Sequence, residues 1–317
     1  MYRRGVLGDI TNTFTGPGLV NRCPARRDTG RDAGRDAGRP GLTGSASAVR
    51  DARFREDILD EPMEDPQHVA EYVKDIYSHM QTVEPLFQPR PHYMTEQREI
   101  NAKMRGILVD WLVEVARKHG LRAETLFMTV NLTDRYLSHR QVPRRKLQLC
   151  GVAAMFVAAK FEEIYPPEVK DFVYITDNAY SKEDILNMEV SMLRTLNFEL
   201  CGPTVAHFLV RFKGLVPNEQ AHLMQYLAEL SMLEVPMLQY SSSQIAAAAA
   251  MLSNKLLRKP STWPPQMAAL SFRSEAEVRL CARELCGTLE AQERSPLQAI
   301  RKKFSQERFS RIARIAG

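Results

Sequence analysis

The stretch MRGILVDWLVEV, residues 104–115, decides the fold because it holds too many apolar residues for an ordinary surface helix. Its apolar arc is far wider than the roughly 100° that a surface helix shows. Such a helix is either central to its domain or keeps an apolar face for a partner, and the pattern alone favours burial. At 3.6 residues per turn, the residues that share one face are Met104, Ile107, Leu108, Trp111 and Val115.

Two charged residues, Arg105 and Asp110, interrupt this apolar helix. Charged side chains are rarely buried unless they are paired. Arg105 therefore needs an acidic partner, and the next predicted helix supplies Asp134. The alternative, in which both charges lie on exposed edges of the helix, stays open at this point.

Helical periodicity continues on both sides of this stretch. Short breaks divide the first block into five predicted helices, at 96–118, 123–138, 145–163, 167–176 and 181–197. After Gly202-Pro203 a second block holds five more, at 203–214, 218–234, 241–258, 264–271 and 274–291. An amphipathic helix that begins near Asp65 precedes both blocks. Because hairpin signals are missing, the sequence predicts an all-α fold with two tandem five-helix domains.

Composition limits the class of protein. The chain has 317 residues, of which 44% are hydrophobic and 26% charged, as in an ordinary soluble globular protein. No long apolar stretch follows the N-terminus, and the longest uncharged segment, 235–254, contains Pro236 and several polar residues. We therefore expect an intracellular chain with neither a signal peptide nor a membrane span. Its five scattered cysteines predict no disulfide framework and no metal site.

The sequence lacks the parts of common enzymes. It contains no Gly-rich phosphate loop, no metal-binding His or Cys spacing and no nucleophile motif. The carboxylate pair Glu162-Glu163 consists of neighbours whose side chains diverge by about 100° on a helix, so they cannot easily share a site. We therefore expect a non-catalytic protein that needs no cofactor.

Charge is distributed unevenly along the chain. Residues 1–55 hold eleven arginines against five aspartates, and residues 294–317 hold seven basic residues against one glutamate, so each end carries a net +6. The total is +5, which leaves −7 for the middle of the chain. Basic ends are typical of nucleic-acid contact or nuclear import, and equally of solvated arms. Residues 16–53, with the near-repeat RDAGRDAGR, predict a disordered linker.

Three long segments resemble one known family in order and spacing. The stretch 104–115 resembles the opening helix of the cyclin box of A- and B-type cyclins. KLQLCGVAAMFVAAKFEEIYPPEV, residues 146–169, and FVYITDNAYSKEDILNMEVSMLRTLNFEL, residues 172–200, continue the match. Glu114 and Phe161 are closer to A-type cyclins, whereas TDNAY and SSSQIAAAAA are closer to B-type, so the subtype stays open.

This resemblance implies two tandem five-helix cyclin boxes behind an N-terminal helix, and a mitotic-type regulatory subunit of a cyclin-dependent kinase. We expect a disordered arm at 1–63, the N-terminal helix and connector at 64–94, and the first box at 95–201. The second box, with a basic C-terminal tail, is expected at 202–310. The predicted role is in S-phase and mitotic progression, in the nucleus and the cytoplasm.

The resemblance also implies which residues meet the kinase. Lys160 and Glu189 would face the kinase, and Arg105 and Asp134 would form a structural ion pair inside the first box. Without the resemblance, we would interpret Lys160 and Glu189 as an ordinary surface or intramolecular ion pair. The apolar contacts around them would be Val157, Phe161, Leu193 and Phe198.

A second surface is implied for substrates and inhibitors that carry an Arg-x-Leu motif. The motif's leucine would enter an apolar groove, and its arginine would meet Glu114. Gly106 stands where the family usually has alanine, and it permits a closer backbone approach. The implied groove residues are Met104, Ile107, Leu108, Trp111, Glu114, Leu147 and Gln148.

The N-terminal sequence RGVLGDITN, residues 4–12, resembles the destruction box that the anaphase-promoting ubiquitin ligase reads. Its implied anchors are Arg4, Leu7, Ile10 and Asn12. Residues 1–73 contain no lysine, and the first possible ubiquitin acceptors are Lys74, Lys103 and Lys118.

A rival interpretation is a nucleic-acid-associated protein, because the core of transcription factor IIB also uses a cyclin-like tandem fold. That function needs a basic groove on the helical domains. Here the middle of the chain is acidic and the positive charge lies at the ends, so we expect no direct contact with nucleic acid.

Overall fold

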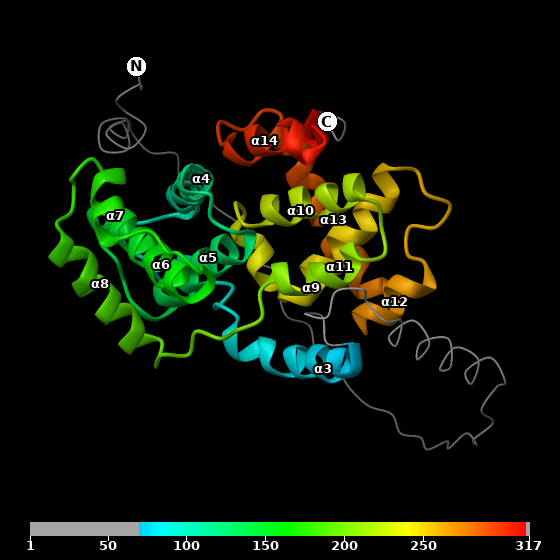
Figure 1. Cartoon of the computed structure of the whole chain (residues 1–317), viewed down its shortest axis with the longest axis horizontal. Coiled ribbons are helices and arrows are strands. Elements are labelled where there is room, and N and C mark those ends of the chain that lie inside the picture. Colours follow the sequence, from blue (N-terminus) through cyan, green and yellow to red (C-terminus); the bar gives the residue numbers. More distant parts are fainter. Residues whose placement is uncertain (1–69, 315–317) are drawn as a thin grey trace, which may run out of the picture. The chain divides into compact units, whose positions relative to one another are not determined.

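The computed structural model describes residues 70–314, and within them it contains twelve α-helices, α3 to α14, and no strand. The all-α prediction with two tandem five-helix domains is confirmed (Figure 1). None of the described helices is long and apolar enough to cross a membrane. The first domain consists of α4 (Ala102–His119), α5 (Ala123–His139), α6 (Leu147–Glu162), α7 (Val169–Ile175) and α8 (Lys182–Thr195). The second consists of α9 (Val205–Lys213), α10 (Asn218–Ser231), α11 (Ser242–Leu256), α12 (Pro265–Ser271) and α13 (Glu275–Gln292).

Two further helices flank these domains, α3 (Val73–Val83) before them and α14 (Ala299–Phe304) after them. Short 3-10 turns join the elements. They are η2 (Ala70–Tyr72), η3 (Glu84–Phe87), η4 (Tyr93–Thr95), η5 (Arg144–Lys146), η6 (Val235–Gln239), η7 (Glu307–Phe309) and η8 (Ile312–Arg314).

The first helix of the first domain begins later than predicted. α4 starts at Ala102 rather than near residue 96, because the side chain of Asn101 accepts a hydrogen bond from the backbone N–H of Met104. This is the usual way in which an N-cap residue satisfies a free amide. The helix ends at Gly120, whose φ of 67° lies in the left-handed region that glycine adopts without strain.

One helix lies at the centre of each domain. In α6 every residue from Leu149 to Ala159 is buried, and a helix that is apolar all round belongs in a core. In α11 the run Ala246–Ala250 is fully buried, and its small side chains let the neighbouring helices approach closely. α6 packs chiefly against α5 and α8, whereas α11 packs against α13, α10 and α9.

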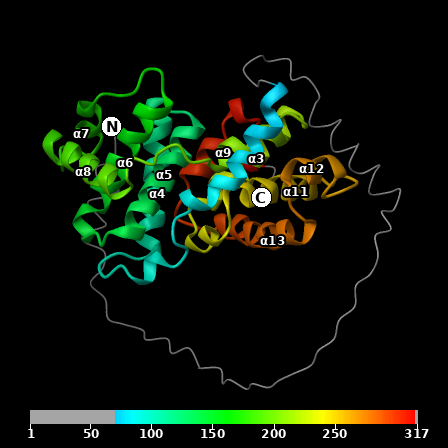
Figure 2. The same ribbon diagram turned by 90° about the horizontal axis from the view of Figure 1, so that it is seen from below.

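The N-terminal helix α3 packs on the second domain, although it precedes the first in sequence. The Tyr77 hydroxyl donates to the carbonyl of His207 over 3.0 Å, and the Gln81 amide donates to the carbonyl of Ser271 over 3.0 Å. Figure 2 shows α3 beside α9 and near α12. At its end the buried Glu84 accepts from Ser243 Oγ over 2.7 Å and pairs with Arg273 over 2.8 Å.

The basic C-terminal segment, for which solvated arms were one of the open alternatives, is folded as far as Arg314. α14 packs against α4 and α10, and Ile300, Phe304 and Ile312 are fully buried. Lys303 reaches the buried Glu229 of α10 over 2.6 Å. Seven basic residues lie in this segment, and a count of charges alone does not show the apolar face that anchors it.

Candidate partner-binding site

The core of the candidate site is an ion pair between α6 and α8. Lys160 lies in the last turn of α6 and pairs with Glu189 of α8. The Lys160 amine also lies 4.0 Å from the ring centroid of Phe156, a cation–π geometry. The Lys160 side chain is 42% exposed and that of Glu189 is 11% exposed. The pair is therefore held by its own domain and presents mainly its cationic end to solvent.

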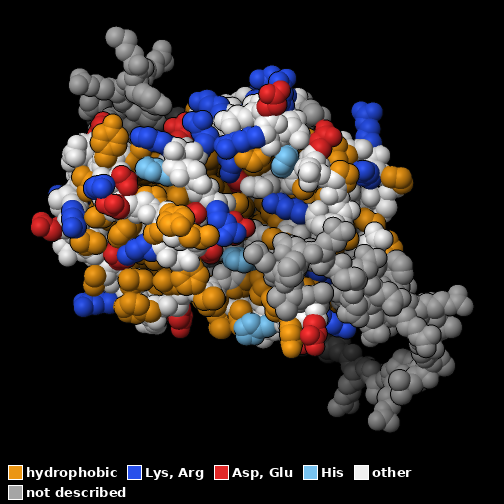
Figure 3. Space-filling view, in the orientation of Figure 1, with side chains coloured by type: hydrophobic (Ala, Val, Ile, Leu, Met, Phe, Trp, Pro, Cys, Tyr) orange, Lys and Arg blue, Asp and Glu red, His pale blue; other side chains and the backbone are white. Residues whose placement is uncertain are grey.

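Large apolar side chains that are not fully covered lie at the end of α6 and at the end of α8, the two helices that hold this pair. Phe161 is 49% exposed and Phe198 is 66% exposed, and Leu193 is partly buried one turn after Glu189. We call these residues, together with Lys160 and Glu189, the α6–α8 surface. Figure 3 shows apolar side chains gathered over this part of the first domain, at the lower left. Exposed apolar groups that cluster in this way mark an interaction site.

The backbone at Phe198 is unusual for an aromatic residue. Asn197 and Phe198 have φ angles of 52° and 58°, in the left-handed region that few residues other than glycine adopt. The Phe198 amide donates to the carbonyl of Leu193 over 2.9 Å, which closes the end of α8. This conformation turns the ring outward, and strained positions of this kind often occur at functional sites.

The structure corrects the assignment of Val157. This residue is only 3% exposed, so it offers almost no surface of its own to another protein. It lies one turn before Phe161 on the buried side of α6, within the helix that forms the centre of the domain. Its role is to support the surface from beneath.

Two prominent residues of this region were missed by the sequence reasoning. Ile164 and Tyr165 follow α6 directly and are 86% and 91% exposed. Their signal was present in the sequence, because two large apolar residues stand in a predicted break just before Pro166-Pro167. Tyr174 of α7 is also exposed, at 71%.

The predicted docking residues lie on α4 and at the start of α6. Leu108 packs directly against α6 at Gly151, where an added Cβ would come within 2.9 Å of Leu108 Cδ1. Met104, Leu108 and Leu147 are buried, whereas Ile107, Trp111, Glu114 and Gln148 are partly exposed. We call these seven residues the α4–α6 face, with the three buried members as its floor.

The opposite side of α4 faces the C-terminal segment. An added Cβ on Gly106 would lie 3.2 Å from Leu297 Cδ1, so glycine permits this close packing rather than shaping the docking face. Asp110 accepts a hydrogen bond from the Ala299 amide over 2.9 Å, at the start of α14. Burial and the neighbouring Glu114 carboxylate raise the pKa of Asp110 to about 6, against the opposing effects of this amide and of Lys302. The wide apolar arc of α4 thus serves two packing partners.

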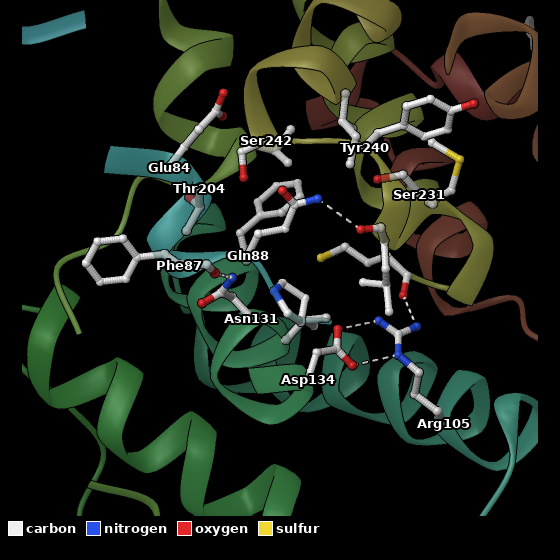
Figure 4. A pocket seen from close by; sticks show the side chains of 18 residues that line it. Glu84, Phe87, Gln88, Arg105, Asn131, Asp134, Thr204, Ser231, Tyr240 and Ser242 are labelled. Carbon is white, nitrogen blue, oxygen red and sulfur yellow. Dashed lines mark hydrogen bonds and ion pairs between the residues drawn. The ribbon is translucent and has the colours of Figure 1, made fainter. Parts of the chain in front are cut away.

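Arg105 and Asp134 form a buried ion pair, and this pair also ties the two domains together (Figure 4). Arg105 donates to both oxygens of Asp134, over 2.8 and 2.6 Å, and to the carbonyl of Met232 in the second domain over 2.6 Å. The Tyr93 hydroxyl adds a 2.6 Å hydrogen bond to Asp134. Removing one partner of such a pair typically costs about 3–5 kcal/mol, so this cluster is structural.

A cavity of about 80 Å³ adjoins this pair at the junction of the two domains. Gln88 and Asn131 line it, and both hold the connector that precedes the first domain: Gln88 donates to the carbonyl of Leu238 in the second domain, and Asn131 donates to the carbonyl of Phe87. Figure 4 shows these polar groups around its walls. The cavity is lined by the same residues that hold the domains in register.

The predicted degradation signal at Arg4, Leu7, Ile10 and Asn12 lies outside the described residues, as does the segment 16–53. Of the three possible acceptor lysines, Lys74 on α3 and both Lys103 and Lys118 on α4 are exposed.

The fold and these surfaces define an all-helical protein of two tandem domains, and comparison with known proteins places it in a family. The model of the cyclin N-terminal domain matches residues 75–201, and that of the cyclin C-terminal domain matches residues 203–317. The chain belongs to the cyclin family. Cyclins are non-catalytic regulatory subunits of cyclin-dependent kinases in the cell cycle, so the chain is not an enzyme.

Relatives of both mitotic subtypes are similar to the chain. The G2/mitotic-specific cyclin-B of Marthasterias glacialis is 42% identical over 263 residues, which cover 82% of this chain and 68% of that protein. Human cyclin-A1 is 45% identical over 246 residues, which cover 76% of this chain and 52% of that protein. The structure of a viral cyclin from herpesvirus saimiri is similar in fold, with a TM-score of 0.61 and 17% identity, over 67% of this chain and 96% of that one.

Proposed function

We propose that this chain binds and activates a cyclin-dependent protein kinase through its α6–α8 surface. The observation that carries the proposal is the Lys160–Glu189 pair, framed by the exposed rings of Phe161 and Phe198. An apolar rim around a charged centre is the arrangement by which an interface gains both affinity and register. Ile164 and Tyr165 extend the apolar area of this surface.

Activation requires no chemistry from this chain. A partner that binds the active conformation of a kinase more tightly than the inactive one shifts the population toward the active state. In that state the kinase lysine pairs with its C-helix glutamate, and the metal-binding aspartate is placed for phosphoryl transfer. A rigid surface suits this task, and α6 is the buried centre of its domain.

The test is a charge swap, Lys160→Glu together with Glu189→Lys. The swapped residues can still pair within the domain, because the two side chains keep their positions on α6 and α8. We expect the double variant to stay helical but to lose kinase activation, since the charge offered to the kinase is reversed. Activity is measured over a concentration series of the variant against a peptide substrate. Normal activation by the folded double variant would overturn the assignment of this surface.

We also propose that the α4–α6 face docks substrates and inhibitors that carry an Arg-x-Leu motif. Trp111 and Ile107 are partly exposed over a buried apolar floor, and Glu114 is one turn along α4 from Asp110. The Glu114 carboxylate suits an arginine, and a partly exposed indole suits a leucine side chain.

Trp111→Ala tests this docking role. We expect weaker phosphorylation of substrates that carry a remote Arg-x-Leu motif and unchanged phosphorylation of a short peptide that contains only the acceptor site. The measurement is kcat/KM for both substrates with the same kinase complex. An equal loss for both would show that Trp111 supports the fold or the kinase contact instead.

The remaining parts of the proposal concern the cell. We propose that the chain acts in S-phase and mitotic progression, in the nucleus and the cytoplasm, until the anaphase-promoting ubiquitin ligase reads residues 4–12. The mitotic cyclins to which it is similar support the first part, and the nine-residue sequence pattern supports the last. A fluorescent fusion followed through synchronised division tests the timing and the location together.

A further inference from the structure

The second domain contains a cleft that the proposed function does not use. It has a volume of about 530 Å³ and lies between α11 and α13, within the range of sites that take small ligands or peptide side chains. Its apolar floor consists of Met251, Leu252 and Ala282, all of which are buried. The α6–α8 surface and the α4–α6 face both belong to the first domain, so this cleft is a separate site.

Three cations line the cleft, Lys255, Arg279 and Arg283, against a single carboxylate, Glu290. Arg279 pairs with Glu275 one turn before it, and Glu290 accepts a contact from the Cys286 thiol over 3.5 Å. Arg283 is exposed, and no ion pair or hydrogen bond reaches it from the described residues. The cleft therefore combines an apolar floor with more cations than carboxylates, and one of these cations, Arg283, has no partner among the described residues.

Gly287 gives an independent reason to expect an occupant. It lies in the middle of α13 and lines the cleft, yet an added Cβ there would meet nothing within 4 Å. Glycine inside a helix costs about 0.5–1 kcal/mol relative to alanine. The described structure has room for a side chain at Gly287, so packing within the domain does not require glycine there. A segment that packs closely against this part of α13 would require it.

Residues 56–65, with the sequence EDILDEPMED, have the complementary chemistry. They contain six acidic residues, no basic residue, and three apolar side chains at Ile58, Leu59 and Met63. The acidic groups suit the three cations of the cleft, and one apolar side chain suits its floor. The arginine-rich sequence before Glu56 has the opposite charge balance, so the complementary chemistry is confined to residues 56–65.

The point at which the described structure begins also favours this segment. Tyr77 and Gln81 of α3 bond to the second domain, so the chain leaves the described part beside the domain that contains the cleft. Residue 60 lies ten positions before Ala70, and ten extended residues span up to about 35 Å. A domain of about 100 residues has a radius of gyration near 13 Å. The segment therefore reaches across the whole of the second domain.

We propose that the acidic segment 56–65 of this chain docks into the cleft between α11 and α13. Its carboxylates pair with Arg283, Arg279 and Lys255, and an apolar side chain covers Met251 and Leu252. Tethering gives the segment an effective concentration in the millimolar range, so weak contacts suffice for occupancy. Docking also shortens the free chain between the N-terminal nine-residue signal and the helical body.

The native cysteines supply the experiment, carried out on the full chain. Cys286 lines the cleft, Cys201 is exposed in the linker between the domains and is not among the lining residues, and Cys281 is fully buried in the same helix as Cys286. Iodoacetamide labelling at fixed pH, followed by peptide mass spectrometry, gives the rate at each thiol. Cys201 reports general reactivity, and Cys281 reports unfolding of α13.

Asp60→Lys together with Glu61→Lys should release the segment. We expect Cys286 to react about tenfold faster in this variant, because a cleft that is occupied nine-tenths of the time exposes its thiol one-tenth of the time. Raising the salt concentration should speed the wild-type reaction at Cys286 in the same direction, since exposed ion pairs are screened. Cys201 and Cys281 should keep their rates in both cases.

Two further variants complete the design. Asp32→Lys with Asp36→Lys makes the same change in net charge outside the segment, and it should leave Cys286 protected. The last variant reverses the charges on both sides of the contact by combining Arg279→Glu and Arg283→Glu with Asp60→Lys and Glu61→Lys. It should restore the protection of Cys286 from iodoacetamide. Equal Cys286 rates in the wild type and the Asp60→Lys/Glu61→Lys variant at low salt would overturn the proposal.

Discussion

Phe198 is the residue at which backbone strain and exposure coincide. Its φ of 58° is unfavourable for a side chain with a Cβ, and its ring is 66% exposed. Within this chain neither property is favourable, because the strain costs about 1–2 kcal/mol and the ring gains no burial. Burial of the Phe198 ring against a kinase would account for both the backbone strain and the exposure of the ring in the free chain.

Phe198→Gly separates these two effects. Glycine adopts the left-handed conformation without strain but loses more freedom on folding, so we expect the free energy of unfolding to change by less than about 1 kcal/mol. Loss of a buried phenyl contact worth about 1.5–3 kcal/mol should raise the Kd for the kinase by about 10- to 100-fold. Calorimetric titration of the kinase with the folded variant measures this change.

Phe272 offers a matched control for that experiment. It follows α12 with a φ of 52° and is 49% exposed, so it shares the backbone geometry and the exposure of Phe198 at a site in the second domain. Phe272→Gly should leave the Kd for the kinase unchanged. Equal losses from both variants would show that the Phe198 effect is not a contact with the kinase.

The residue scale also shows what the sequence can and cannot predict. The pairing of Arg105 with Asp134 follows from elementary reasoning, because a charge in so apolar a helix needs a partner. The third contact of Arg105, to the carbonyl of Met232, does not follow from any pattern, since backbone acceptors carry no sequence signal. The resemblance placed Val157 among the contacts, but it carries no information on burial.

At the scale of elements, α4 and α14 depend on each other through Asp110. Its carboxyl group accepts from the Ala299 amide at the start of α14, and its pKa is raised to about 6. A carboxyl group with a raised pKa contributes stability that is full below its unfolded pKa and is lost as the pH rises through the folded value. Asp110 therefore favours the folded state most at acid pH.

Asp110→Asn should remove this pH dependence while keeping an oxygen that accepts from Ala299. We expect the free energy of unfolding of the variant to rise relative to the wild type as the pH increases from 4 to 7. Urea titrations followed by circular dichroism at several pH values provide the measurement. A constant difference across this range would contradict the assignment.

Asp184→Asn is a control for which the stability difference from the wild type should change with pH in the opposite direction. Hydrogen bonds from the backbone and side chain of Ser181 lower the pKa of Asp184. A lowered carboxyl pKa contributes stability that is present above the unfolded value and is lost as the pH falls. The Asp184→Asn variant should therefore lose stability relative to the wild type as the pH rises, which is opposite to Asp110→Asn.

Most elements were predictable because their periodicity is strong, and the exceptions have identifiable causes. The start of α4 was misplaced because most of residues 96–101 are helix-compatible, whereas the cap at Asn101 sets the boundary. The helix α14 was missed because six residues are too few for a periodic signal. Its burial depends on α4 and α10, which lie far away in the sequence.

At the scale of the whole described structure, long-range contacts tie the two domains to each other and to the segments that flank them. Arg105 reaches Met232, Glu84 reaches Arg273, and Asp110 reaches Ala299. Gly202 in the linker packs so closely on Phe87 that an added Cβ would lie 2.3 Å from its ring. None of the partners in these pairs is near the other in sequence, so only the folded chain reveals them.

The position of the acceptor lysines links this folded body to its proposed destruction. Residues 1–73 contain no lysine, so a ligase that reads residues 4–12 and modifies only lysine must reach the helical body. Lys74 lies in the first turn of α3 and is exposed, and it is the acceptor nearest to the signal. Proximity therefore favours Lys74, followed by Lys103 and Lys118 on α4.

Changing Lys74, Lys103 and Lys118 to arginine should slow degradation at mitotic exit and leave kinase activation unchanged, because the substitutions keep the charge and lie outside the α6–α8 surface. Arg4→Ala with Leu7→Ala should stabilise the protein more strongly, since both anchors of the recognition peptide are lost. The same lysine-to-arginine change at Lys170, Lys182 and Lys259, which are exposed and lie farther along the chain, is the matched control and should leave the half-life unchanged. Mass spectrometry of ubiquitin remnants on the wild-type chain is the direct measurement. Remnants found mainly on second-domain lysines or on the N-terminal amine would show that distance from the signal does not govern the choice of acceptor.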